Sequence, residues 1–113
     1  MYTNLTPHDV TIVGEDDETI VVLPSEGVAR AAVSSTVTGS LEVNGSQVNI
    51  VTRTFGEPVD LPDPQEGVMI VVSLITAQAA KAVGRDTSDL LVTSDPVRGD
   101  DGRIIGCRSF SQV

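Results

Sequence analysis

Four arginines in the last third of the chain have the clearest capacity for chemistry. Arg85 opens a short polar segment that ends at Asp89, and Arg98 and Arg103 flank a turn rich in glycine and aspartate, with Arg108 following. Guanidinium groups form forked hydrogen bonds with carboxylates and phosphates. If these arginines converge, they bind an anionic ligand, and Asp89 selects hydroxyl or amino groups beside it. The alternative is a solvated turn region in which arginines and aspartates pair with one another.

The single histidine, His8, lies in the segment NLTPHDVTIV, just before a β-prone run. Pro7 fixes the backbone and Thr6 is able to bond neighbouring backbone groups, so one role for His8 is to close the start of the strand with a ring hydrogen bond. The other role is a contact to a ligand. We expect the structural role, which leaves the C-terminal arginines as the better candidates for binding.

Catalysis and metal binding lack the residue combinations that they need. The chain holds one histidine and one cysteine, Cys107, and it shows no G-x-S-x-G segment, no two-histidine metal motif and no glycine-rich phosphate loop. The acidic turns lack the alternating ligand pattern of a calcium loop. We therefore predict a protein that is not an enzyme, with no catalytic residue, no metal and no cofactor.

Composition narrows the range of partners. Sixteen acidic residues stand against seven basic ones, so the net charge of −9 repels nucleic acid and anionic membranes. The few aromatic residues also weaken any model based on base stacking. No apolar stretch approaches the roughly 20 residues of a membrane span, and no export signal is recognisable. A lone cysteine forms no internal disulfide, which favours the cytoplasm.

Several hairpins must carry these residues. The runs 10–13 and 19–23 flank an acidic turn, and Asn44-Gly45 divides two β-prone runs in 41–55 as a type I′ turn requires. A segment with three prolines, 56–67, is expected to be a semi-extended loop. A last hairpin is expected over 96–110, with Arg108 on its more apolar face.

One passage differs from the hairpins. The run 68–73 is continuously apolar and predicts a central strand, and the alanine-rich segment 74–83 predicts a short helix that ends at Gly84. A further strand is expected over 89–92. The length of 113 residues suits one domain, 1–113. The fold class is therefore α+β and β-dominated, with about seven or eight mostly antiparallel strands and one helix.

Segments along almost the whole chain, in the same order, resemble a family of short proteins from bacteriophages and actinobacterial mobile elements. They are NLTPH before a strand, LPSEGVAR, RTFGEPVDLPDPQEGVMIVVSLITAQAA, GRDTSDLLV and VRGDDGRIIGCRSF. The resemblance carries no settled activity. It implies a phage origin and a place in the cytoplasm of the host, with the virion as the alternative.

Two functions are compatible with these observations. The first is a non-enzymatic binder that sequesters a small anionic, nucleotide-like ligand such as a host-defence signal, through Arg85, Arg98, Arg103, Arg108, Asp89 and His8. The second is a protein-interaction module, either a virion accessory protein or a binder of a host protein. In both cases the aliphatic strands, protected at 46–55 only by Arg53, predict a homo-oligomer.

Overall fold

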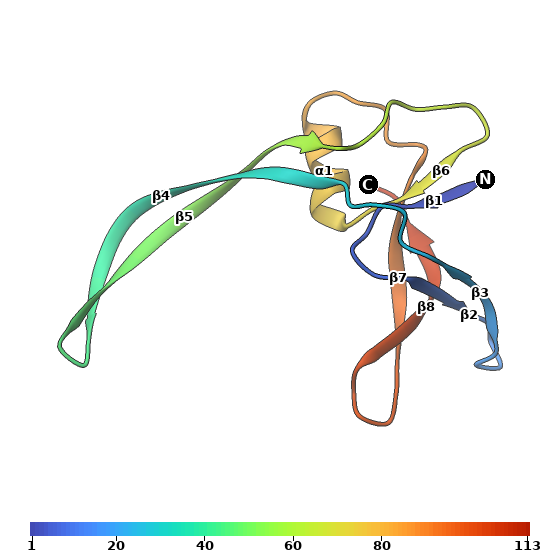
Figure 1. The fold of residues 1–113 in the computed structure, drawn as a ribbon, viewed down its shortest axis with the longest axis horizontal. Coiled ribbons are helices and arrows are strands. Elements are labelled where there is room, and N and C mark those ends of the chain that lie inside the picture. Colours follow the sequence, from blue (N-terminus) through green and yellow to red (C-terminus); the bar gives the residue numbers. More distant parts are fainter.

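A computed structural model describes residues 1–113 as a six-stranded sheet with one helix and a long projecting hairpin. The sheet has the order β1-β6-β7-β8-β2-β3, and the projecting ribbon pairs β4 with β5 (Figure 1). The elements are β1 (Tyr2–Asn4), β2 (Val10–Val13), β3 (Thr19–Leu23), β4 (Arg30–Val43), β5 (Ser46–Val59), β6 (Met69–Val71), α1 (Leu74–Ala82), β7 (Leu90–Arg98) and β8 (Ile104–Ser111). The β-dominated α+β class expected from the sequence is confirmed.

The β6-α1-β7 passage forms the centre of the sheet. β6 lies between β1 and β7 and runs parallel to both. The helix begins at Ser73, whose side-chain oxygen accepts a hydrogen bond from the Thr76 backbone N–H, as favourable N-cap residues do. The helix ends at Ala82, and Gly84, just beyond the C-cap, has a φ of +84° that favours glycine. The predicted helix and central strand are both confirmed.

Hairpins build the rest of the sheet. β2 and β3 are antiparallel, as are β7 and β8, in agreement with the sequence. Two features were not expected. β1 adds a parallel strand beside β6, and β2 meets β8 in parallel at a single pair, Ile12 and Cys107. The sheet is therefore mixed, although most of its pairing is antiparallel.

The Asn44-Gly45 hairpin is confirmed, since both residues have positive φ, +50° and +84°. It is much longer than expected, because pairing continues from the turn back to Arg30 and Val59. The loop predicted from residue 56 therefore begins later. Pro58 fits in β5 because a two-stranded ribbon leaves one edge of each strand unpaired, where proline loses no hydrogen bond.

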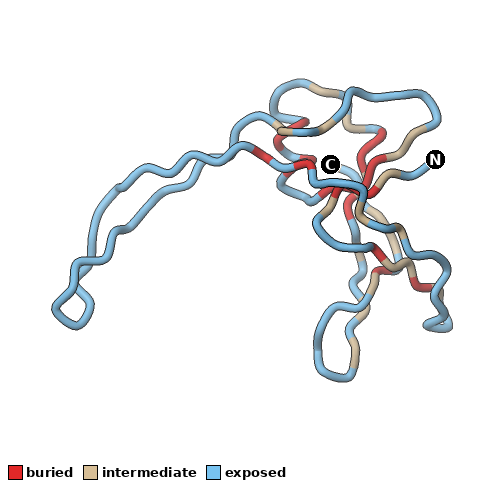
Figure 2. Tube along the Cα trace, viewed as in Figure 1, coloured by how far each residue is buried: buried red, intermediate tan, exposed pale blue.

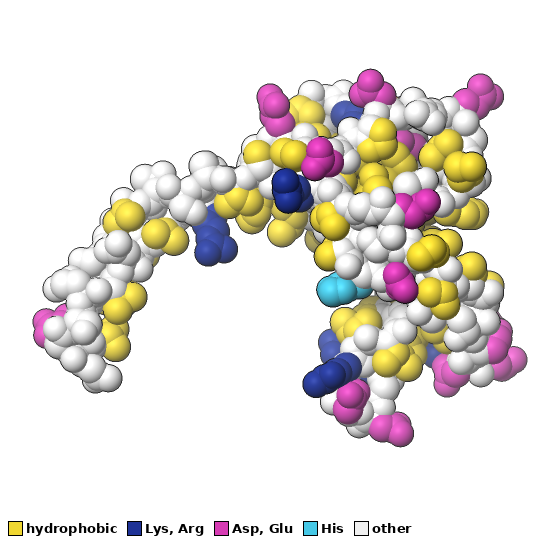
Figure 3. All heavy atoms as spheres, viewed as in Figure 1, with side chains coloured by type: hydrophobic (Ala, Val, Ile, Leu, Met, Phe, Trp, Pro, Cys, Tyr) yellow, Lys and Arg dark blue, Asp and Glu magenta, His cyan; other side chains and the backbone are white.

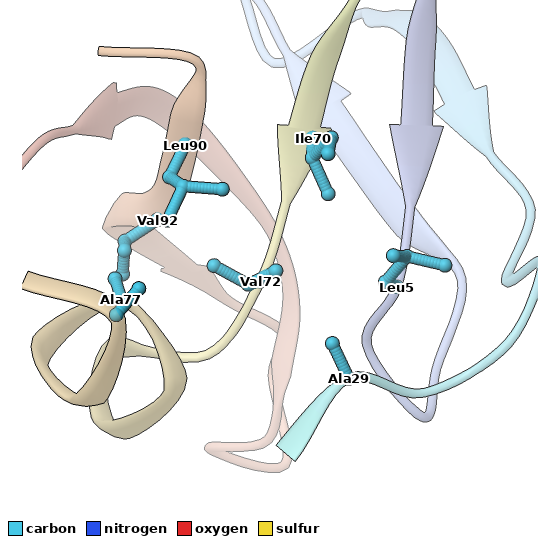
Figure 4. Close-up of a cluster of buried hydrophobic side chains, with 8 residues drawn as sticks. Leu5, Ala29, Ile70, Val72, Ala77, Leu90 and Val92 are labelled. Atoms are coloured by element: carbon cyan, nitrogen blue, oxygen red, sulfur yellow. The ribbon is translucent and has the colours of Figure 1, made fainter. Parts of the chain in front are cut away.

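The core is small and lies between the sheet and α1. Eight buried residues form its main cluster, and Figure 4 shows Ala77 of the helix beside Val72, which directly follows β6, and Val92 of β7, with Leu5 and Ala29 farther along. Only 17 of 113 residues are buried, and almost all of the projecting hairpin is exposed (Figure 2). The fold thus consists of a body with a thin core and an exposed arm, here named the arm (residues 30–59).

No helix is long and apolar enough to cross a membrane. The longest principal extent of the molecule is 53 Å, and the arm accounts for it (Figure 1).

Candidate functional site

A groove of about 660 Å³ lies on the body and is here named the His8 groove. Its walls come from the loop before β2, the start of α1 and the strands β2, β7 and β8. The lining residues are Thr6, His8, Asp9, Val10, Thr11, Val72, Ser73, Leu74, Val92, Thr93, Ser94, Pro96, Ile104, Ile105, Gly106 and Cys107. This volume lies within the range of small-molecule sites, roughly 300 to 1,000 Å³.

Asn4 positions the loop that carries His8. The Asn4 side chain is almost fully buried, and its amide nitrogen donates to the carbonyl oxygens of His8 and Leu23, each at 2.9 Å. Its oxygen accepts hydrogen bonds from the backbone N–H and the hydroxyl of Thr6, at 2.9 and 2.6 Å. All of its hydrogen-bonding capacity is used inside the chain, so Asn4 acts as a positioning residue for the loop.

His8 itself is exposed, and its imidazole makes no hydrogen bond within the chain. The expected ring hydrogen bond at the start of the strand is therefore absent. The backbone carbonyl of His8 closes this turn, since it accepts from Asn4 and from the Thr6 hydroxyl at 2.9 Å. The ring is left free at the wall of the groove, where it is available to a ligand.

The N-terminus of α1 reaches the same groove. The backbone N–H groups of Leu74 and Ile75 donate to no group of the chain, as the first turn of a helix requires. Leu74 and the N-cap Ser73 both line the groove. A helix N-terminus carries partial positive charge and favours anions. The groove thus has an end that favours negative charge although the protein is acidic overall.

Cys107 forms part of the groove but is mostly buried. Burial raises the pKa of the Cys107 thiol above its ordinary value of 9.0, and a backbone hydrogen bond involving Ser94 opposes this shift. The thiol is therefore protonated at neutral pH. Cys107 packs with Val10 and Val71 in a small buried cluster, and the thiolate, not the thiol, is the reactive form of cysteine.

None of the four candidate arginines lines the groove. Arg85 makes a forked pair with Asp89, at 2.9 and 3.0 Å, and also donates to the carbonyl oxygens of Pro62 and Asp86. Both side chains of this pair are about nine-tenths buried. Arg85 and Asp89 therefore join the proline-rich loop to the start of β7. For these two residues the structure shows pairing of an arginine with an aspartate, which is the second of the two alternatives that the sequence left open.

Arg98 and Arg103 lie at the β7–β8 end of the groove. Arg98 is paired in register with Ile104, a groove residue, and Arg103 directly precedes it. Arg98 donates to the carbonyl oxygen of Gly102 at 2.7 Å, and Arg103 pairs with Asp101 at 3.6 Å with both side chains exposed. Such an exposed pair is weak, so the Arg103 guanidinium is free to exchange partners.

Arg108 is directed away from this end. Its guanidinium donates to the carbonyl oxygen of Gly14 and to the carboxylate of Asp17, in the turn between β2 and β3. The structure therefore separates the arginines into three places, and none of them lines the groove with His8. Asn4, Ser73 and the start of α1 were missed by sequence reasoning, although the N-cap pattern of serine before the alanine-rich segment was available as a signal.

No group of three or more His, Cys, Asp or Glu side chains is arranged to hold a metal ion. No protein-family model matches the chain, and neither a curated protein nor a solved structure matches it.

Proposed function

We propose that the protein is a non-enzymatic binding protein that takes up a small anionic, nucleotide-like ligand in the His8 groove. The observation that carries the proposal is the meeting of the free His8 imidazole and the α1 N-terminus in one groove of about 660 Å³. Both groups donate hydrogen bonds to an anion when the imidazole is protonated or suitably oriented. Arg98 and Arg103, which lie beside the groove residue Ile104, add positive charge next to the groove.

The remaining walls suit the neutral parts of such a ligand. Val10, Val92 and Ile105 provide apolar surface for a ring, and the hydroxyls of Thr93 and Ser94 offer donors and acceptors beside it. The Asp9 carboxylate in the same groove accepts a hydrogen bond from the Ser25 backbone N–H through one oxygen, and its other oxygen is open to hydroxyl or amino groups of a ligand. This combination of anion donors, apolar wall and hydroxyl partners is what a nucleotide-like molecule requires.

Binding without turnover fits the chemistry of the groove. A protonated, buried thiol and serine and threonine hydroxyls with no base in hydrogen-bond contact are not activated nucleophiles. The resemblance to short phage proteins supplies a setting for the proposal, in which the protein lowers the free concentration of a host-defence signal in the infected cell.

Native mass spectrometry of the protein purified from its host tests the proposal, because it detects a retained small molecule and the stoichiometry together. Calorimetric titration with nucleoside diphosphates then compares variants. His8→Ala is expected to weaken binding by roughly tenfold or more, the scale of one charged hydrogen bond, and Arg98→Ala by less. Lys81→Ala, a cation removed from outside the groove, serves as the control. Equal affinities for the wild type, His8→Ala and Lys81→Ala would contradict the assignment of the groove.

A further inference from the structure

The arm carries an apolar stripe that nothing in its own chain covers. In its inner half, Val33, Val37 and Phe55 are between 52 and 59% exposed. In its outer half, Leu41 and Val48 are 58 and 47% exposed. A two-stranded hairpin is marginally stable at best in water when no other element packs on it. A ribbon of this length with so many exposed aliphatic side chains needs a partner surface.

A bulge moves this stripe from one face of the ribbon to the other partway along the arm. In the inner half, Val37 lies opposite Val51, on the same face as the Val33 pair. The register shifts between Val37 and Gly39, and beyond it Leu41 lies opposite Val48, on the other face. Two-stranded ribbons twist strongly, so the two halves of the stripe also turn with the ribbon along its length. Figure 3 shows hydrophobic side chains along the concave side of the outer arm.

The exposed area has the size of a protein interface. The accessible surface is 7575 Å², whereas a compact monomer of this mass exposes about 5,900 Å². The difference of roughly 1,700 Å² per chain exceeds the ~800 Å² per partner of a standard stable interface. The radius of gyration, 17.6 Å, likewise exceeds the ~13 Å of a compact chain of this length.

The charge of the arm indicates which kind of surface covers the stripe. The arm contains two arginines and two glutamates, so its net charge is zero, and the rest of the chain carries the whole charge of −9. Neither Arg30 nor Arg53 forms an ion pair within the chain. Arg53 lies on the apolar face of the inner arm, opposite Ser35. The stripe therefore fits an apolar surface bordered by carboxylates, and the body of this protein provides one.

That surface is the outer edge of β3. β3 is the last strand of the sheet, and Ile20, Val21 and Val22 are 63, 42 and 47% exposed. An unprotected aliphatic edge of this kind is unusual in a monomer. The acidic turn 14–18 adjoins it. The arm and β3 project from opposite sides of the body (Figure 1), so the arm of one copy is placed to reach β3 of another rather than its own.

We propose that the arm docks on the β3 edge of a second copy of this chain, reciprocally, with Arg53 facing the partner's acidic turn. If the contact is reciprocal, two copies form a closed assembly, and the arm stripe and the β3 edge of each copy are both buried. The structure thus assigns a surface and an acceptor to the self-association that the sequence predicted.

Sedimentation velocity of the full-length protein tests this assignment. The wild type is expected to be a dimer or a higher closed assembly. Val37→Asp on the stripe and Ile20→Asp on β3 are each expected to raise the dissociation constant about 100-fold or more, since each buries an unpaired charge. Thr36→Asp is the matched control, because Thr36 lies next to Val37 but pairs with Thr52 on the opposite face. Its dissociation constant is expected to stay within about threefold of the wild type.

A charge exchange tests the acceptor independently. Arg53→Glu is expected to weaken association roughly tenfold, and Asp16→Arg in the same chain is expected to restore most of it. If a variant does not fold, amide hydrogen exchange of the wild type still tests the proposal. Dilution of the wild type is expected to lower the protection of backbone amides in the arm and in β3 together. A monomeric wild type at tens of micromolar, equal effects of Val37→Asp and Thr36→Asp, or arm protection that is independent of β3 would each overturn the proposal.

Discussion

At the residue scale, Asn4 is the side chain on which the shape of the groove depends most. It is 1% exposed and bonds Thr6, His8 and Leu23 at once. Asn4→Ala removes the four hydrogen bonds that this side chain makes, so we expect the free energy of unfolding to fall by about 2 kcal/mol in urea titrations. Asn49→Ala on the exposed arm is the control, with an expected change below about 0.5 kcal/mol. An equal response of the two variants would contradict the positioning role.

The pair of Arg85 and Asp89 gives a second prediction for a single site. Because both side chains are largely buried, Arg85→Ala leaves an uncompensated carboxylate and is expected to cost about 3 kcal/mol of stability. Replacing both residues, with Arg85→Met and Asp89→Leu, is expected to recover most of that loss. Chemical unfolding of the three proteins checks this. If the double variant is no more stable than Arg85→Ala, the cost arises from packing and not from the unpaired charge.

Cys107 predicts a pH dependence. Its pKa in the folded protein is raised above the ordinary 9.0, so the unfolded chain loses this proton first as the pH rises. The contribution to stability is therefore fully present below about pH 9 and is lost as the pH rises through the higher pKa of the folded state. We expect the melting temperature of the wild type to fall more steeply above pH 9 than the melting temperature of Cys107→Ala. Parallel profiles would show that the thiol ionises equally well in both states.

At the scale of elements, the approach of β2 to β8 depends on Gly106. A Cβ at this position would lie 2.7 Å from Val13 and 2.9 Å from the Thr11 carbonyl oxygen, both closer than atoms normally approach. Gly106→Ala is therefore expected to destabilise the protein by about 1 to 3 kcal/mol and to disturb the groove wall. The control is Gly39→Ala in the arm, where the nearest atom would be at an ordinary 3.8 Å. Equal melting temperatures would argue against this packing.

The sequence predicted elements whose signals are local. The Asn44-Gly45 turn needs positive φ at both residues, and the alanine-rich helix with its terminal glycine depends on neighbours a few residues apart. Long-range features were not accessible in this way. The parallel pairing of Tyr2–Asn4 with β6 depends on residues far apart in the chain, and no local pattern specifies it. The sequence also did not predict that the arm extends through Pro58. Proline normally argues against a strand, but the unpaired edge of a two-stranded ribbon tolerates it.

The candidate site shows the same limit. Arginines close together in the sequence suggested one anion site, but Arg85 bonds Asp89 and the proline-rich loop while Arg108 bonds the β2–β3 turn. Residue types therefore indicated the kind of hydrogen bond that these arginines form but not which partners the topology supplies. The groove brings together His8 and Ser73, which are far apart in the sequence.

At the scale of the whole molecule, the small core and the large exposed surface predict how the free energy of unfolding depends on the protein concentration. If the arm binds a second copy only in the folded state, association removes folded monomer from the unfolding equilibrium. A roughly 100-fold increase in protein concentration is then expected to raise the free energy of dimer unfolding by about 2.7 kcal/mol, seen as a higher melting temperature. Val37→Asp abolishes this dependence if the stripe is the interface, and Thr36→Asp preserves it. A melting temperature of the wild type that is constant over this range would mean that the arm remains uncovered, and that the body alone stabilises the fold.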